Sequence, residues 1–356
     1  MRRSLTCSVL IALVAPAFGQ ETAVDAVADA LAREFERQEL VGLAAATVVD
    51  GEIREYHLGH ADREDDVPVD STTMFRWASI SKPVTAVRAM QLAHEDELDL
   101  DADVRDLVPE FPAKPWTVTA RQLLGHLGGV VHYRNGKVVR TEREYDVEHP
   151  FEDLVLALDT FKESPLVAEP GTRFAYTTHG YILLGAVVQR AGEASYWDQV
   201  QRSIAEPLEM ISFRPDYQWE DIPHRAVGYR RFLGKVIRST DTDVSWKLPG
   251  GGYISTVGDL ARFARALCGE ELLPREVLDE MWTVQRARDG DLTQYGLGFS
   301  VAKIDGRLRI GHSGAQEKTR TIMQVFPDED RAIVVMTNSQ YANTGEIAAA
   351  IWASDR

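Results

Sequence analysis

A serine and a lysine three residues apart, Ser79 and Lys82, are the residues of this sequence best suited to chemistry. They lie in residues 75–86, a pattern that predicts a helix starting near Ser79 and continuing to about residue 96. Residues three apart share one face of a helix, so the amine can reach the hydroxyl. Serine is a good nucleophile only beside a base that takes its proton, and a partly deprotonated lysine can be that base. Pro83 has no N–H to bond the carbonyl of Ser79, which favours Ser79 in the first turn.

The same spacing occurs a second time, at Ser300 and Lys303. This copy follows residues 295–299 and runs toward the turn-like Asp305-Gly306, a pattern that predicts a strand. Residues three apart on a strand point to opposite faces, so this pair cannot act together. Ser79 is therefore the candidate nucleophile.

Two further motifs follow in order along the chain: Tyr-x-Thr at Tyr176 and Thr178, and His-x-Gly at His312 and Gly314. With Ser-x-x-Lys they resemble the three motifs of the penicillin-recognising serine hydrolases. Supporting segments at residues 122–129, 180–185, 251–256 and 295–298 also match that family. The resemblance covers nearly the whole chain after its N-terminal segment. Within that family the sequence resembles the class C beta-lactamase group, which includes D-peptidases and esterases, and it most resembles the mitochondrial serine beta-lactamase-like branch of that group.

The resemblance implies a role for each matching residue. Ser79 is the expected nucleophile, and Lys82 and Tyr176 are expected to share its proton. The expected substrate-binding residues are those of the second and third motifs: Thr178, His312, Ser313, Gly314 and Ala315. The backbone N–H groups of Ser79 and Ala315 would form the oxyanion hole. Taken singly, Tyr176 could also be a buried phenol, Thr178 a turn residue and His312 a strand-end histidine.

The sequence departs from the family pattern at two motif positions. Thr178 stands where asparagine is usual, and His312 stands where true class C beta-lactamases have lysine. A neutral histidine holds a substrate carboxylate less firmly than a lysine does. The charged residues 315–320 also replace a glycine-rich continuation. We therefore expect peptidase or esterase activity rather than efficient beta-lactam hydrolysis.

The sequence predicts no cofactor and no metal site. His57 and His60 look like a ligand pair, but a strand places them on opposite faces. Residues 249–252 are rich in glycine, yet they lack the Lys-Ser/Thr of a phosphate-binding loop, so they indicate tight backbone packing. The expected partner is a small-molecule or peptide substrate, and the sequence makes no prediction of oligomeric state.

The formal net charge is −16, which disfavours nucleic-acid binding through bulk charge. One local cluster is basic, and it comprises Arg225, Arg230, Arg231, Lys235 and Arg238. We interpret this cluster as a solvated hairpin, with an anion-binding rim as the alternative.

Residues 1–19 have the pattern of a secretory signal peptide. Arg2 and Arg3 precede an apolar stretch at residues 9–14, and residues 17–19 offer small side chains for cleavage. A retained membrane anchor is the alternative. Removal of this segment would leave Cys268 as the only cysteine, so we expect no intramolecular disulfide. The expected location is secreted or periplasmic, with no membrane span after cleavage.

The remaining pattern predicts elements that could position the site. A helix over residues 22–38 precedes a hairpin at residues 43–49 and 53–58 that turns at Asp50-Gly51. Further helices are expected at residues 119–124, 180–193, 259–267 and 344–353, and further strands at residues 295–301, 308–311, 321–326 and 332–336.

Strands at both ends of the chain, with helices between them, predict an α/β (α+β) fold. Its antiparallel sheet would be flanked by helices and built from residues 20–82 and 240–356. Residues 83–239 would form a mostly helical inserted domain. We interpret the chain as an exported serine hydrolase that acts through an acyl-enzyme on peptide, amide or ester substrates. The alternative is a catalytically silent binding or self-assembling member of the same fold.

Overall fold

The structure is a computed structural model that describes residues 25–355. The predicted signal peptide lies outside these residues. A seven-stranded antiparallel sheet forms the centre of the fold, in the order β3-β2-β1-β12-β11-β10-β9. Its strands are β1 (Gly42–Val49), β2 (Glu52–Asp62), β3 (Val67–Pro68), β9 (Ser300–Ile304), β10 (Arg307–Gln316), β11 (Thr319–Phe326) and β12 (Arg331–Thr337).

The two ends of the chain meet in the middle of this sheet. β1 pairs with β12, with Leu43 opposite Thr337 and Val49 opposite Arg331. β1 also forms the predicted hairpin with β2, and Asp50 and Gly51 have the positive φ values of 49° and 79° that a tight hairpin turn requires. The predicted α/β fold with an antiparallel sheet built from both chain ends is therefore confirmed.

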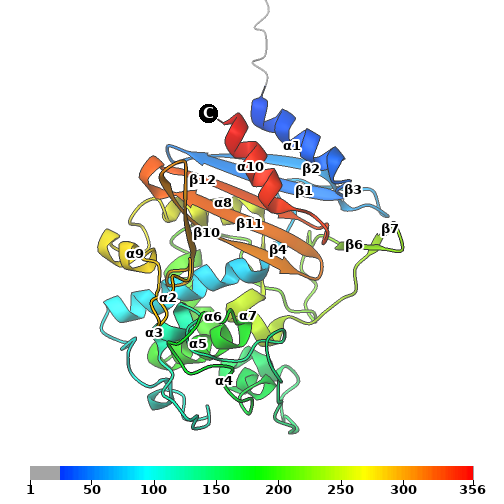
Figure 1. Ribbon diagram of the computed structural model, residues 1–356. Coiled ribbons are helices and arrows are strands. Elements are labelled where there is room, and N and C mark those ends of the chain that lie inside the picture. The colour runs from blue at the N-terminus through cyan, green and yellow to red at the C-terminus, as the bar shows by residue number, and fades with distance from the viewer. Residues whose placement is uncertain (1–24, 356) are drawn as a thin grey trace, which may run out of the picture.

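Alternate residues of β12 show what covers each face of the sheet. Val335 packs with α1 (Ala26–Arg37) and α10 (Thr344–Ser354), which lie together over one face (Figure 1). Its neighbours Val334 and Met336 belong to the larger core on the other face, which includes α8 (Val257–Ala266). The large core also extends into the helical part of the molecule.

The helical part lies beside the sheet face that α8 covers (Figure 1). Its central helix is α2 (Ser81–His94), in which every residue of the stretch from 81 to 92 is buried, and it packs against α5 (Thr178–Ala191) and α7 (Leu248–Gly251). The other helices are α3 (Ala120–Leu124), α4 (Leu154–Ala157), α6 (Tyr196–Val200) and α9 (Arg275–Met281). A small sheet joins β4 (Phe75–Arg76), β8 (Tyr253–Ser255) and β5 (Arg214–Pro215). No helix within residues 25–355 has the length and apolar character needed to cross a membrane.

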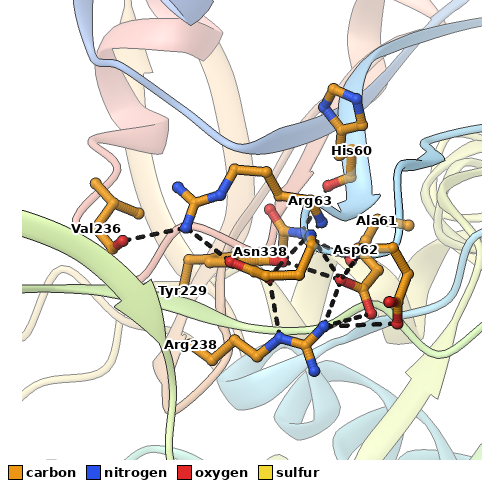
Figure 2. A network of polar contacts seen from close by, with 10 residues as sticks. His60, Ala61, Asp62, Arg63, Tyr229, Val236, Arg238 and Asn338 are labelled. Carbon is orange, nitrogen blue, oxygen red and sulfur yellow. Dashed lines mark hydrogen bonds and ion pairs between the residues drawn. The ribbon is translucent and has the colours of Figure 1, made fainter.

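Four of the five residues of the basic cluster lie in the predicted hairpin, which is formed by β6 (Tyr229–Phe232) and β7 (Lys235–Arg238). The fifth, Arg225, precedes the hairpin and pairs with Asp216 at 2.9 Å. Figure 2 shows how polar contacts attach it to the end of β2: Arg238 reaches Asp62 at 2.7 Å, and the backbone N–H of Arg63 donates to the Tyr229 hydroxyl at 2.7 Å. Arg231 pairs with Glu39 at 2.8 Å. Ion pairs therefore engage much of this cluster's charge.

Two predicted strands have different bounds in the structure. The strand predicted from residue 295 begins only at Ser300, because Gly298 has a φ of 94° and passes so close to α2 that a Cβ would lie 2.2 Å from the Ala86 Cβ. The strand predicted to end at Gly311 continues to Gln316, so the third motif lies within β10 rather than after a strand. Both differences depend on tertiary packing.

Candidate active site

Ser79 lies in a single 3₁₀ turn, η1 (Ala78–Ile80), directly before α2. Ala78 has a φ of 49°, a left-handed conformation that is unfavourable for a residue with a Cβ. The turn is held against the sheet, because the Thr321 hydroxyl donates to the Trp77 carbonyl at 3.0 Å. A constrained backbone thus presents the half-buried Ser79 at the start of the helix.

Lys82 is fully buried, and its amine has three polar neighbours. Nζ lies 3.2 Å from Ser79 Oγ, 3.3 Å from Thr178 Oγ1 and 2.7 Å from the carbonyl oxygen of Gly250. A neutral amine has two N–H donors and one lone pair. Two donated bonds, to Gly250 and Thr178, therefore leave the lone pair free to accept the Ser79 proton.

Burial lowers the pKa of Lys82 well below that of an ordinary lysine, and the nearby Lys247 cation lowers it further. Among residues 25–355, no carboxylate forms an ion pair with Lys82. The charged form therefore has no compensating partner. Compared with an ordinary lysine, the site therefore favours the unprotonated amine, which is the form that can act as a base.

Tyr176 completes the group around Ser79. Burial raises the pKa of its phenol, and a hydrogen bond with Ser79 opposes part of that rise. Its ring lies 4.9 Å from Lys82 Nζ and 4.3 Å from the ring of His126. Tyr176 is therefore a protonated phenol at neutral pH, suited to donating or relaying a proton.

The third motif runs along β10 beside the nucleophile. Gly314 lies so close to the Ser79 turn that a Cβ there would be 2.5 Å from the Trp77 carbonyl oxygen and 2.1 Å from Thr321 Oγ1. Only glycine lets the strand approach this closely. The closeness places Ser313 and Ala315 at the mouth of the same cavity as Ser79.

His312 is buried, and its Nδ1 lies 2.7 Å from the carbonyl oxygen of Ser313. A carbonyl only accepts, so Nδ1 carries the proton and Nε2 is an unprotonated acceptor. Burial, with a smaller effect of the Lys82 cation, lowers the pKa of His312 to about 3. His312 thus offers the site a lone pair and no positive charge.

A cavity of about 580 Å³ opens above Ser79, between β10 and the loops at residues 132–135 and 173–176. Its lining includes Tyr176, His312, Ser313 and Ala315. Thr178 is buried behind it, with its hydroxyl on Lys82. The substrate-binding role of Thr178 stays a prediction, and the contact that the structure shows is with the amine of Lys82.

Three further neighbours of the candidate site were not among the predicted site residues: His132, Lys247 and Gly250. His132 lines the cavity, and its Nδ1 accepts the backbone N–H of Thr178 at 3.3 Å. Burial and then Lys82 lower the pKa of His132 to about 3, so its proton lies on Nε2 as a donor. The sequence gives no indication that these three residues lie beside Lys82 or the cavity, because His132 and Lys247 lie far from the motifs and Gly250 lies within a glycine run.

No group of residues suited to holding a metal ion is present within the described part of the chain. His57 Nε2 instead lies 3.2 Å from Glu55, and His60 Nε2 lies 3.1 Å from Asp66. The candidate groups for chemistry beside the cavity are Ser79, Lys82 and Tyr176.

A half-buried serine, a buried lysine amine and a phenol lie together beneath an open cavity, and these are the groups that serine acyl transfer requires. Residues 25–355 match the beta-lactamase family, and the chain belongs to this family of serine hydrolases.

Among its relatives is the human serine beta-lactamase-like protein LACTB, mitochondrial, which is 30% identical over 86% of this chain and 72% of that protein. Penicillin-binding protein 4* of Bacillus subtilis (strain 168) is 26% identical over 82% of this chain and 66% of that protein. The structure resembles the D-amino acid amidase of Ochrobactrum anthropi SV3, with a TM-score of 0.77, 21% identity and coverage of 93% of this chain and 98% of that chain. The last likeness concerns the fold alone.

Proposed function

We propose that this protein is a serine hydrolase that cleaves peptide, amide or ester bonds through an acyl-enzyme on Ser79. The observation that carries the proposal is the 3.2 Å approach of a fully buried, unpaired Lys82 amine to Ser79 Oγ. A silent binding protein gains nothing from an uncompensated lysine in its core, because burial of a potential charge costs stability.

Each residue has a defined step in the proposed reaction. Lys82 Nζ takes the Ser79 proton while Ser79 Oγ bonds to the carbonyl carbon of the substrate. Backbone N–H groups of Ser79 and Ala315 stabilise the resulting oxyanion. The leaving group departs with a proton that Lys82 returns through Tyr176, and the acyl group remains on Ser79. A water molecule then attacks the acyl-enzyme ester, with its proton passing along the same residues in the reverse direction, and the carboxylic acid leaves Ser79.

The third motif favours peptides and esters over beta-lactams. The carboxylate of a beta-lactam needs a cation or a donor at the third-motif residue, and His312 offers an acceptor lone pair there. Nε2 is buried and the imidazole is neutral, so His312 offers a substrate carboxylate neither a donor nor a positive charge. We therefore propose that efficient beta-lactam hydrolysis is not the activity of this protein.

Covalent labelling with a fluorophosphonate probe tests the assignment. Ser79→Ala should abolish labelling, while Ser313→Ala and Ser300→Ala should retain it. Ser313 is the matched control, because it is a serine exposed in the same cavity, and Ser300 is engaged with the Gly311 carbonyl at 2.8 Å. Labelling that persists in a folded Ser79→Ala variant would refute the nucleophile, and an unlabelled wild-type protein would favour the silent alternative.

We also propose that the protein is exported, on the basis of the signal-peptide pattern in residues 1–19. Mass spectrometry of the N-terminus of the protein made in its own cell tests this. A mature chain that starts near residue 20 is expected, and one that retains residues 1–19 would contradict the proposal.

A further inference from the structure

Two arginines at the mouth of the active-site cavity lack acidic partners. Arg134 and Arg173 both line the cavity above Ser79, on the two loops that form its wall. Neither forms an ion pair within residues 25–355, although the salt bridges of this chain engage many other arginines. Arg173 donates one bond, to the Val167 carbonyl at 2.9 Å. Arg134 lies 5.9 Å from the ring of Tyr133. Both guanidinium groups therefore retain free donors.

The charge of the whole chain makes this arrangement unusual. The sequence has 55 acidic residues against 39 lysines and arginines, so acidic partners outnumber basic ones. The described residues that line the cavity nevertheless include no aspartate or glutamate. The basic hairpin shows the ordinary outcome, because Arg238 and Arg231 there are paired with acids (Figure 2 shows Arg238). The cavity mouth is thus a local positive region on an acidic protein.

A third arginine lies close to this region. Arg320 follows the third motif on β11, and its guanidinium donates to the backbone carbonyls of Gln316 at 3.0 Å and Thr319 at 2.8 Å. Its pKa is lowered mainly by burial, and Arg134 is close enough to lower it further, although Glu317 opposes the shift. The positive region therefore extends from the loops that carry Arg134 and Arg173 to β11, the strand that carries Arg320.

We propose, on the basis of the acyl-transfer function proposed above, that the acyl donors of this enzyme carry a negatively charged group that Arg134 and Arg173 bind. A carboxylate is the chemical class that a planar guanidinium fork fits best. His312 is neutral and presents an acceptor, so the positive charge lies at the cavity mouth and not at the third motif. The substrate charge must therefore stand away from the scissile carbonyl.

Matched substrate pairs test the proposal. One pair is phenyl hydrogen adipate and phenyl heptanoate, a small dicarboxylic monoester and its neutral analogue. The other pair is the p-nitroanilides of acetyl-glutamate and acetyl-glutamine, which represent an acidic peptide. The measured quantity is the ratio of kcat/KM for the charged over the neutral member. We expect wild-type ratios of about five for one pair or both, since a single exposed charge contact is typically worth up to about a fivefold effect and two arginines are available.

Arg134→Gln and Arg173→Gln should each lower that ratio by about threefold, because each removes one charge contact with the charged member of the pair. The ratio should also fall as salt rises from about 0.05 M to about 0.5 M, because salt screens exposed charges. Arg33→Gln is the matched control: Arg33 is exposed on α1, on the far side of the sheet, and should leave the ratio unchanged.

The outcomes separate the two proposals. The proposed charge preference is wrong if the neutral member of each pair is preferred, or if neither arginine variant changes the ratio. Turnover that depends on Ser79 would still support the hydrolase proposal in that case. If Ser79→Ala retains turnover of these substrates, the hydrolase proposal itself fails. Preference for the charged member in the ester pair alone indicates small dicarboxylic donors, and in the anilide pair alone it indicates acidic peptides.

Discussion

The dependence of acylation on pH gives the sharpest test of Lys82. A lysine with an ordinary pKa of about 10.4 would be unprotonated in only about one molecule in a thousand at about pH 7.5. If Lys82 were such a lysine, kcat/KM would rise about tenfold per pH unit up to about pH 10. Burial without a carboxylate partner lowers the pKa of Lys82 well below that value. We therefore expect the rate to reach its plateau well before about pH 10.

The other groups in the cavity do not produce this rise. His132 and His312 have pKa values of about 3, so both are neutral throughout the neutral range. The pKa of Tyr176 is raised, so the phenol keeps its proton. Lys247 is the exception, because burial lowers its pKa to about 8. The Lys247→Met variant distinguishes the contributions of the two lysines to the pH profile. Removal of the Lys247 cation should raise the pKa of Lys82, so the rise of kcat/KM should shift to higher pH while the plateau rate stays unchanged.

The assay is hydrolysis of a neutral phenyl ester over about pH 5–10, with the Ser79→Ala protein as the blank for hydroxide-catalysed hydrolysis. A neutral ester keeps substrate ionisation out of the profile. A profile that climbs with unit slope through about pH 10 would show an ordinary lysine and refute the inference drawn from burial. A profile of Lys247→Met that loses its rise altogether would identify Lys247, and not Lys82, as the titrating base.

Two further perturbations have defined outcomes. Lys82→Ala and Tyr176→Phe should each lower the acylation rate by about 10²–10⁴-fold. The double variant should lose less than the product of the two losses, because both residues move the same proton. Single-turnover rates measure this, and losses that multiply fully would show that the two residues have separate roles. Asp216→Asn should cost about 3–5 kcal/mol of unfolding free energy in urea, because it breaks the buried pair with Arg76. Asp101→Asn, at an exposed pair, should cost less than about 1 kcal/mol, and equal losses would contradict the role of burial.

The motifs and the fold were predictable because they depend on local chemistry. The hairpin turn follows from Asp50 and Gly51, whose positive φ values the structure shows. The approach of Lys82 to Ser79 follows from a spacing of three on a helical turn, although the serine lies in a 3₁₀ turn and the lysine in α2. The strand geometry expected for Ser300 is likewise observed in β9.

The walls of the cavity could not be predicted, because they depend on which loops meet in space. The Gly250 carbonyl and Lys247 act on Lys82 from a segment more than 160 residues away in the chain. The sequence identifies Gly314 only as a residue of the third motif, whereas in the structure it lets β10 pass against the Ser79 turn. The arginines of the mouth lie in irregular loops, where side-chain type alone says nothing about position.

The cavity uses two kinds of basic side chain in opposite ways, and burial accounts for the difference. Lys82 lies in the interior, where a lysine loses its proton because water no longer stabilises the charge. Arg134 and Arg173 are exposed at the mouth, and a guanidinium keeps its charge at any pH at which the protein works. If a lysine replaced Arg134, it would remain charged but lose the planar fork. If an arginine replaced Lys82, it would never yield a base. Residue type and depth together therefore assign proton transfer to the interior and charge recognition to the rim.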